Sequence, residues 1–505
     1  MEGCSLASAR GKWTLAATVL ASGAVFLLTT AVSIALPAIQ QYFDATISDL
    51  QWIVNAYLLA LTAPLLVGGA LGDLFGRKRI FSIGLALMSV SAVLAGLAPT
   101  VSSLILFQAV LGVASALVVP QSLSVISACF RESERGQAIG LWAGLSGAIA
   151  APGPWLGGWL VQQYSWRAVW FMAAPITILA LIFVYFFVLE SRNKLSRRID
   201  WVGALLILAG LLGIAYALIS GPGAGWTSPR ILAPLTGGVL SLVAFVLVEA
   251  RQREPLVPLR IFRNRFVAGA NACTLMLYFA LNGVLFFMVL NMQQVQGYSA
   301  NASGLGLLPP IALITFLSGP AGMLADRIGA RLPMILGPAL VALGTVWLAL
   351  SGTGASYVRH YLPGLSLLGI GMALVIAPLT KSALAVEPEL AGAASGVNNG
   401  IARVAALLAI TILGVIIVST FTLRLGEAVN TPELTLAQRT ELLAQSDKLG
   451  GIVIPATFDE AARRAARQAI NESFIYGFRR AMAVCALLAF LATAFSAAMI
   501  PQKGG

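Results

Sequence analysis

Charged residues are scarce in this sequence. Only 10% of the 505 residues are Asp, Glu, Lys or Arg, 58% are hydrophobic, and the mean hydropathy is +0.88. A soluble protein of this size could not cover its surface with so little charge. The apolar residues form fourteen runs of roughly 20 residues, the length that a helix needs to cross a bilayer. Because helices are the only open-chain way to satisfy backbone polar groups in lipid, the sequence predicts an all-α membrane protein.

The predicted spans are 14–36, 50–70, 80–99, 102–128, 139–162, 168–189, 201–221, 231–249, 266–290, 302–324, 332–351, 361–380, 396–420 and 475–498. The long segment between the last two spans is polar. Within it, Thr457 followed by Glu460 predicts a capping box that opens a helix, and Thr431-Pro432 predicts a second helix start.

Histidine and cysteine are also rare. The chain has one histidine, His360, and four cysteines, and neither residue type is spaced like a metal site or a disulfide framework. The sequence has no phosphate-binding loop and no nucleophile elbow. These absences argue against an enzyme, a metal site and a bound cofactor. A gradient, and not nucleotide hydrolysis, would then have to drive any transport.

Apart from Glu249, the last residue of span 231–249, none of the twenty acidic residues falls inside a predicted span. A proton relay at the middle of a membrane normally needs a titratable group there, and cationic compounds likewise prefer a buried carboxylate. Apart from Arg479 and Arg480 near the start of the last span, the predicted spans contain one cation, Arg403. We therefore expect transport to depend weakly or not at all on an imposed pH gradient.

Positive charge exceeds negative charge by 12. The placement of this charge indicates a membrane and not a nucleic acid partner. With the N-terminus inside, 20 of the 32 Lys and Arg lie on the inner side, and short outer loops hold three, Arg167, Arg230 and Arg359. This positive-inside bias predicts a plasma membrane protein, in a bacterium the inner membrane, with both termini cytoplasmic and residues 421–474 outside.

One polar pattern occurs twice between apolar runs, at Gly69–Arg79 and at Gly322–Arg331. Asp73 and Asp326, at matching positions, lie 253 residues apart, and the spans at the start of each half begin 252 residues apart. Two landmarks with one period predict a duplicated membrane bundle with a parallel repeat.

This repeat divides the chain into three parts. We expect an N-terminal six-helix bundle at 14–190, a linker with two extra helices at 191–265, and a C-terminal six-helix bundle at 266–498 that includes the outer loop 421–474. A bundle pair of this kind binds a small-molecule substrate between its halves and needs only the lipid bilayer around it. We expect a monomer.

The repeated pattern is a candidate gate. Asp73 lies at the C-terminal end of a helix, where the macrodipole disfavours a carboxylate, so it needs cationic partners such as Arg77 and Arg135. A charged cluster there can latch the halves in one state, whereas the alternative interpretation is a turn that anchors the chain at the inner surface. The candidate gating residues are Gly69, Gly72, Asp73, Gly76, Arg77, Lys78, Asp326, Arg327 and Arg331.

These residues resemble a known family. G-A-L-G-D-L-F-G-R-K at Gly69–Lys78 is similar to the loop signature of the major facilitator superfamily, and G-P-W-L-G-G at Gly153–Gly158 is similar to its antiporter signature. The segments at 34–37, 50–59 and 293–299 resemble the fourteen-helix drug:proton antiporter branch. The resemblance implies the major facilitator fold, with two six-helix bundles plus two inserted helices, and a secondary transporter of the multidrug efflux type.

Gly153, Pro154, Gly157 and Gly158 carry a second expectation. Glycines let helices approach closely, and prolines free backbone groups and kink a span. The resemblance associates this kink with export, whereas the residues alone are equally compatible with a packing kink.

Five positions depart from the family patterns, among them Leu111 in the fourth span, where the branch has Gln, and Ile149, where the antiporter signature has its leading Gly. The branch usually has an acid in the first span, where this chain has Leu28, and an amide where this chain has Ser33. It usually has a buried Arg in the fourth span, where this chain has Gln108. The remaining cavity candidates are polar and aromatic residues of the spans. The full candidate set is Trp52, Asn55, Tyr57, Gln108, Gln121, Trp142, Tyr278, Asn282, Gln294, Asn398 and Arg403.

Three functions fit these observations. The first is a secondary exporter of amphipathic neutral or anionic compounds. The second is an ordinary proton-coupled multidrug antiporter that titrates a group at a helix end, such as Asp49 or Asp73. The third is a non-transporting membrane sensor on the same fold, which the duplicated gate pattern disfavours.

The topology can be tested by labelling. An Ala444→Cys variant should react rapidly with a membrane-impermeant thiol reagent added to intact cells, because the charge bias places 421–474 outside. Protection of this cysteine in intact cells, with reaction only after lysis, would overturn the predicted orientation.

Overall fold

Helices account for nearly all of the described chain. A computed structural model describes residues 4–192, 200–252, 255–387 and 390–499. Within these ranges the extended structure is limited to one isolated bridge, between Cys4 and Phe130. The helices of the first half are α1 (Ala9–Phe43), α2 (Ile47–Phe75), α3 (Arg77–Gly96), α4 (Val101–Cys129), α5 (Glu132–Ala150), α6 (Gly153–Gln163), α7 (Ala168–Phe171) and α8 (Ala173–Phe187).

An extra helix pair, α9 (Trp201–Ala224) and α10 (Pro229–Glu249), precedes the second half. The remaining helical segments are η1 (Leu259–Arg263), α11 (Arg265–Leu290), η2 (Asn291–Val295), α12 (Ala300–Gly306), α13 (Leu308–Ile328), α14 (Arg331–Ala349), η3 (Tyr357–Tyr361), α15 (Leu362–Ala383), α16 (Ala391–Ala428), α17 (Leu436–Leu443), η5 (Ser446–Gly451) and α18 (Glu460–Met499).

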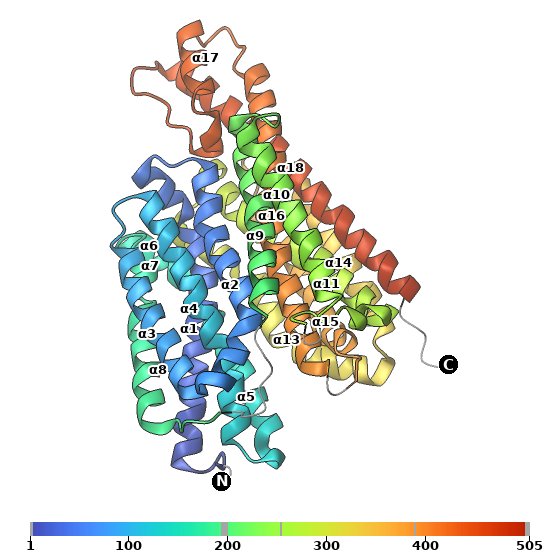
Figure 1. Cartoon of the computed structure of the whole chain (residues 1–505). Coiled ribbons are helices and arrows are strands. Elements are labelled where there is room, and N and C mark those ends of the chain that lie inside the picture. The colour runs from blue at the N-terminus through green and yellow to red at the C-terminus, as the bar shows by residue number, and fades with distance from the viewer. Residues whose placement is uncertain (1–3, 193–199, 253–254, 388–389, 500–505) are drawn as a thin grey trace.

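The helices form two bundles that share one apolar core. In the first bundle α1 packs on α4, α5, α6 and α8, and α4 also packs on α2 and α3. In the second bundle α11 packs on α15, α16 and α18, and α14 packs on α15 and α18. The extra helix α9 packs on α10 and also contacts α2 of the first bundle and α16 of the second (Figure 1). The pair therefore lies against both bundles.

Fourteen spans were expected, and the described residues contain fewer that qualify by length and hydropathy. Twelve helices are long and apolar enough to cross a membrane, and α2, bent by 50° between Thr62 and Val67, makes a thirteenth. The remaining expected span, 139–162, is divided into α5 and α6 at Ala151 and Pro152. Proline has no backbone N–H, so it ends the preceding helix. The divided segment does not qualify as a span by length and hydropathy, and the count of fourteen therefore stays a prediction.

The polar segment 421–474 is largely helical. Helices α16 and α18 continue past the bundle and carry α17 between them at one end of the molecule (Figure 1). Both predicted helix starts are wrong by two to four residues. Helix α17 begins after Thr435, whose side chain accepts from Gln438 N in a capping box, and α18 begins after Asp459, whose carboxylate accepts from Ala462 N at 2.7 Å. Thr and Asp are both good N-caps, so several starts in this segment were compatible with the same signals.

Candidate functional site

Polar contacts between the two bundles lie at the end that carries α17. Gln51 Nε2 of α2 donates to Ile410 O of α16 at 2.6 Å, and Asn55 Nδ2, one turn further, donates to Thr411 Oγ1 at 3.2 Å. Gln51 and Asn55 are both buried. These bonds join the first turns of α2 to the middle of α16.

Closer to α17, a second set of contacts joins the bundles. Gln294 Nε2 donates to Gln40 Oε1 at 2.6 Å, and Gln40 Nε2 donates to Lys448 O at 3.1 Å. Lys448 also forms an ion pair with Asp44 at 2.6 Å. The segment between α17 and α18 therefore fastens the end of α1 to the second bundle.

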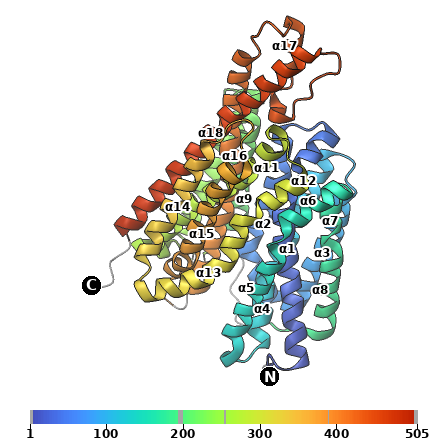
Figure 2. The same ribbon diagram turned by 180° about the vertical axis from the view of Figure 1, so that it is seen from behind.

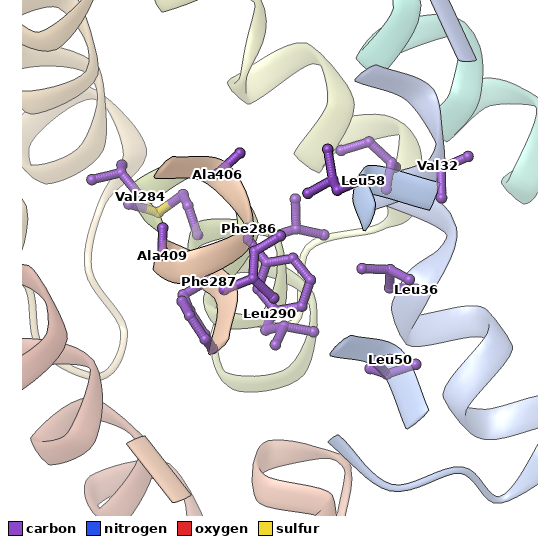
Figure 3. Packing of buried hydrophobic residues seen from close by; sticks show 14 of the residues in the cluster. Val32, Leu36, Leu50, Leu58, Val284, Phe286, Phe287, Leu290, Ala406 and Ala409 are labelled. Carbon is purple, nitrogen blue, oxygen red and sulfur yellow. The ribbon is translucent and has the colours of Figure 1, made fainter. Parts of the chain in front are cut away.

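An apolar seam lies beneath these contacts. Figure 3 shows Phe286 and Leu290 of α11 beside Leu36, Leu50 and Leu58 of the first bundle. All five side chains are buried. Buried apolar surface excludes water, so the bundles are sealed at this end.

Glycines bring α6 close to two neighbours. A side chain at Gly153 would meet Thr30, and one at Gly157 would meet the backbone of Ala31, so both glycines hold α6 against α1. On the other face, a side chain at Gly158 would meet the backbone of Ala300 in α12, and one at Gly304 would meet the backbone of Pro154. The antiporter-type motif therefore packs α6 onto α1 and, across the bundle interface, onto α12.

The opposite end is open between the bundles. Figures 1 and 2 both show the bundles diverging toward the chain termini. On α5, the Cβ positions of Gly136, Gly140, Gly144 and Gly147 have no other atom within 4 Å. Leu145 of the same helix is 49% exposed. The conformation is therefore closed at the α17 end and open at the end that holds the termini.

The first copy of the gate pattern lies at this open end. Arg77 pairs with Asp73 at 2.8 Å and also donates to Ser124 O of α4 at 3.3 Å. Arg135, the second expected partner, makes no ion pair with Asp73 among the described contacts, and its Nε has no hydrogen-bond partner. Asp73 is thus held within its own bundle and makes no ion pair with the second one.

Three glycines shape this copy. Gly69 and Gly72 face α4, where a side chain at Gly72 would meet Gln121. Gly76 connects α2 to α3. Its φ of +108° is a backbone conformation that favours glycine. Gly329 has φ +92° at the matching position of the second copy, 253 residues later. The repeat in the sequence is therefore also a repeat of backbone turns.

Glu190 is part of this site and was missed by the sequence reasoning. Its carboxylate accepts from the backbone N–H groups of Lys78 at 3.1 Å and Arg79 at 3.2 Å, at the N-terminus of α3. An anion is stabilised there by the free N–H groups and the positive end of the macrodipole. Lys78 Nζ reaches Tyr185 O at 2.7 Å, which ties α8 to the same turn. One signal could have pointed to Glu190: α3 begins after Gly76, which has no side chain to cap the helix, so the free N–H groups need an acceptor from elsewhere.

The second copy is arranged differently. Asp326 pairs with Lys381 at 2.8 Å, and both side chains are well exposed. Arg331 donates to Ala497 O of α18 at 3.3 Å. Arg327 lies beside Asp326 in the last turn of α13 and makes interactions of its own. In both copies the aspartate therefore pairs with a basic residue of its own bundle in this conformation.

Three of the positions that depart from the expected branch pattern meet in one pocket. Leu28 and Ser33 of α1, Tyr57 of α2 and Gln108 of α4 all line it, together with apolar side chains of α1 and α2 and with Thr29. Its volume in this conformation is about 30 Å³, which is far below that of a site for a drug-sized compound. The pocket contains no charged residue, so its polar groups are neutral hydroxyls and an amide.

Hydrogen bonds fix two of these polar groups. Thr29 Oγ1 donates to the Tyr57 hydroxyl at 3.3 Å, and Trp170 Nε1 donates to Gln108 Oε1 at 3.3 Å. Leu58, another lining residue, lies beside Phe286 of the second bundle (Figure 3). The pocket therefore adjoins the seam between the bundles.

The other cavity candidates are spread over the molecule. Asn55 and Gln294 lie in the bundle interface described above. Trp52 contacts Tyr216 of α9, with ring centroids 6.3 Å apart and the ring planes tilted by 50°. Gln121 donates to Gly68 O at 2.7 Å, and Trp142 Nε1 donates to Ser22 Oγ at 3.1 Å. These last three side chains contribute to helix packing.

Four candidates belong to the second bundle. Asn282 donates to Tyr278 O at 2.8 Å, and Asn398 donates to Thr274 Oγ1 at 2.8 Å. Arg403 is partly buried and lies within electrostatic range of Tyr278. The structure does not bring these four residues to the pocket of the first bundle.

Comparison with known proteins identifies the relatives of this chain. Residues 18–410 match the family described as the Major Facilitator Superfamily. The chain is 35% identical over 403 residues to the multidrug resistance protein Stp of Mycobacterium tuberculosis, which covers 79% of this chain and 75% of that protein. It is 32% identical over 492 residues to the tetracenomycin C resistance and export protein of Streptomyces glaucescens, covering 95% and 90%. A puromycin resistance protein of Streptomyces alboniger is also 32% identical, over 82% of this chain and 83% of that protein.

Solved structures share the fold at lower identity. A bacterial homologue of the human lysosomal transporter Spinster superposes with a TM-score of 0.67 at 16% identity, covering 97% of each chain. A D-xylose–proton symporter superposes with a TM-score of 0.59 at 15% identity, covering 98% of this chain and 99% of that one.

The α6–α12 contact can be tested with one methyl group. Gly158→Ala should destabilise the protein by about 1 to 3 kcal/mol, because the new Cβ overpacks against the backbone of Ala300. Gly144→Ala is the matched control, since its Cβ enters open space, and should be neutral or stabilising by about 0.5 to 1 kcal/mol. Thermal unfolding of the purified protein in detergent measures both. Equal midpoints for the two variants would show that this contact does not hold the bundles together.

The gate interpretation predicts a kinetic effect. Asp73→Asn should slow transport by about tenfold for each 1.4 kcal/mol that the charge contributes to switching between states. Expression and substrate binding should change little, because the Asp73–Arg77 pair lies away from the pocket and a partly exposed pair contributes at most about 1 kcal/mol to stability. Asp447→Asn, an exposed acid near α17, serves as control. If Asp73→Asn transports at the wild-type rate, the loop is not a gate and only anchors the chain at the membrane surface.

Proposed function

The chain belongs to the Major Facilitator Superfamily, and from this premise we propose that it exports amphipathic small molecules across the plasma membrane by secondary active transport. Relatives that align over most of their length are named for resistance to multiple drugs, tetracenomycin C and puromycin. Two of these names specify an export or multidrug role. The apolar pocket at the bundle seam supports the same function in this chain.

The pocket carries the proposal for the substrate class. Once movement of the bundles widens the pocket, its neutral wall of leucines and valines can bury an apolar compound, and the hydroxyls and the amide of Gln108 can orient the polar groups of that compound. A cation would lose its hydration in this pocket without gaining a carboxylate, because Leu28 occupies the position where related transporters usually have an acid. Neutral or anionic amphipathic compounds therefore fit better than cations.

Two conformations are needed for alternating access, and the fold supports both. The seal at the α17 end consists of a few hydrogen bonds and an apolar seam between otherwise separate bundles. The aspartates of the two gate copies pair within their own bundles at the open end. Closing that end while opening the other would move the pocket from one side to the other, which is the usual motion of duplicated transporters.

The proposed orientation puts both termini in the cytoplasm and the α17 end outside, so the structure would accept substrate from the inner side. The positive-inside bias supports this orientation. We further propose the division into bundles at 14–190 and 266–498, with 191–265 as the linker, and a monomer as the functional unit. The helix count within a bilayer and the export direction belong to the same proposal.

Proton coupling through the helix-end acids has little support. Asp49 forms a capping box with Thr46, in which its carboxylate accepts from Thr46 N at 2.9 Å. Asp73 pairs with Arg77. Both carboxylates therefore have structural partners outside the pocket, and we propose that proton flux is not stoichiometrically coupled to substrate.

A charge placed in the pocket tests site and function together. In cells lacking other efflux pumps, the wild-type protein should lower the accumulation of neutral amphipathic dyes. Leu28→Asp should weaken the export of neutral dyes and strengthen that of cationic dyes. The affinity for each dye should change by about tenfold for each 1.4 kcal/mol of altered binding free energy. Leu28→Met, which conserves volume, is the control and should behave like the wild type.

The outcomes separate two failures. If the wild-type protein changes the accumulation of no neutral, anionic or cationic compound, the export function is wrong. If the wild type exports and Leu28→Asp has the wild-type preference, the substrate binds elsewhere.

A further inference from the structure

Two buried acids lie at the junction between the extra helices and the second bundle. Asp200 immediately precedes α9, and Glu249 is the last residue of α10. Asp200 is 8% exposed and Glu249 is 2% exposed, and no other acidic residue of the described ranges is buried. The sequence census placed both at span ends and gave no sign that folding would bury them together.

Asp200 is held by N–H donors. Its Oδ1 accepts from Gly203 N at 2.8 Å, which caps α9, and from Gln252 Nε2 at 3.0 Å. Its other oxygen, Oδ2, is buried and accepts no hydrogen bond from an N–H group of the described residues. Donors directed at a carboxylate favour its charged form, so Asp200 is the better anion of the two.

Glu249 closes the opposite side of the junction. Its Oε2 accepts from Val257 N at 2.8 Å, and its Oε1 is buried without an N–H donor. A side chain at Gly203 would meet both this Oε1 and Asp200 Oδ2. The two free oxygens therefore converge on one spot beside Gly203.

No basic side chain of the described residues forms an ion pair with either carboxyl. The charged residues on the elements packed nearby are Arg230 on α10, Arg251, Arg260 and Arg263 after it, Arg265 on α11, Glu387 before α16, Arg403 on α16, and Asp73 on α2. Lys194, Arg197, Arg198, Arg253 and Glu254 lie outside the described residues. None of the charged groups on the described elements acts on the pair as strongly as the two carboxyls act on each other.

Two carboxyls in contact without a cation cannot both be ionised, because the like charges repel in a site that water does not solvate. A proton between them removes the repulsion and supplies the donor that both free oxygens lack. We propose that Asp200 and Glu249 form a proton-binding site that holds one proton in this conformation and fastens the α9–α10 pair to the start of the second bundle.

The chemistry of Asp200 fits the acceptor side of this bond. Burial alone would raise the pKa of Asp200, but hydrogen bonds from Glu249, Gly203 and Gln252 outweigh it and hold the pKa of this carboxyl below its usual value. Asp200 therefore stays charged at neutral pH, and the proton resides on Glu249.

The proton matters for the linker because of what Glu249 holds. Val257, its backbone partner, packs with Phe245 of α10, Ile261 of η1 and Val397 of α16 in a separate apolar cluster. This cluster joins the extra helices to the segment that leads into α11. Loss of the proton would place two negative charges in contact beside this cluster and loosen the attachment.

The site also lies on one side of the molecule. Asp200 and Glu249 occupy the end of the α9–α10 pair that points toward the chain termini, away from α17 (Figure 1). It would bind and release its proton on the same side, so it gives pH sensitivity without proton transport. The consequence for transport rate rests on the function proposed above, whereas the proton site itself does not.

Thermal unfolding tests the proton site directly in the purified full-length protein. An unfolded carboxyl releases its proton near about pH 4, whereas the folded pair keeps one, so stability is complete at low pH and is lost as pH rises. Between about pH 6 and about pH 9 the unfolding midpoint of the wild type should fall by about 2 °C or more. Glu249→Gln keeps the donor toward Asp200 and the acceptor for Val257 without a proton to lose, and its midpoint should not vary with pH beyond that of the controls.

Two further variants complete the series. Asp200→Asn preserves an N-cap residue and removes the like charge beside Glu249, so its pH dependence should be weaker than that of the wild type, with burial of Glu249 leaving a remainder. Glu132→Gln removes an exposed acid at the start of α5 and should keep the wild-type dependence. The proton site is overturned if the wild type and Glu249→Gln show the same pH dependence.

Infrared difference spectroscopy covers the case in which the variants fail to fold. The wild type should show the carbonyl band of a protonated carboxyl at about pH 7, where exposed acids are ionised, and this band should vanish at high pH. Absence of such a band would overturn the proposal without any variant.

Transport in vesicles then separates regulation from function. Wild-type transport should change with the pH on the side of the termini, Glu249→Gln should not respond, and neither should move protons in step with substrate. Identical responses in both would contradict the regulatory role while leaving export intact. If no compound is transported, the export function fails, and the unfolding and infrared measurements still decide the proton site.

Discussion

The close approach of the two bundles at the α17 end determines how the rest of the molecule is arranged. Helices in lipid gain little from the hydrophobic effect, so they associate through close packing and hydrogen bonds between small and polar residues. Gly158 and Gly304 allow this approach, and Gln51 and Asn55 add buried hydrogen bonds across it. With one end sealed in this way, the other end is left to diverge (Figures 1 and 2).

The polar groups of the chain follow the same division. Asp73, Arg77 and Glu190 lie at the divergent end and are satisfied within the first bundle. The pocket keeps neutral groups, and the buried carboxyls lie away from it, beside the extra helices. Substrate binding, gating and proton binding thus occupy separate places in this account, linked through the movement of the bundles.

Much of the fold could be predicted from the sequence because its determinants are local. Long apolar runs specify helices, the 253-residue period specifies two copies, and the family resemblance is confirmed by the comparisons. The prolines near Pro152 predicted a kink in one expected span, but the apolar run continues through that point, so the sequence did not show that the helix would divide into α5 and α6. The starts of α17 and α18 were displaced because neighbouring residues such as Thr435 and Asp459 cap equally well.

The site was harder to predict because its contacts join distant segments. The sequence showed that Leu28, Ser33 and Gln108 depart from a pattern, but only the packing of α1, α2 and α4 brings them into one pocket. Glu190 has no local motif, and its role depends on where α8 ends relative to α3. Candidates such as Trp52 and Trp142 were chosen by residue type, and in this conformation their partners are residues of neighbouring helices.

The central claim is that one protein alternates between this conformation and one closed at the end of the termini. A direct measurement is the distribution of distances between spin labels at Gln137 of α5 and Thr380 of α15, two exposed positions in different bundles, in a variant whose four cysteines are replaced. The account predicts that an exported compound adds a population at shorter distance, because the bundles close over the pocket at this end. A single distribution that no exported compound changes would contradict it.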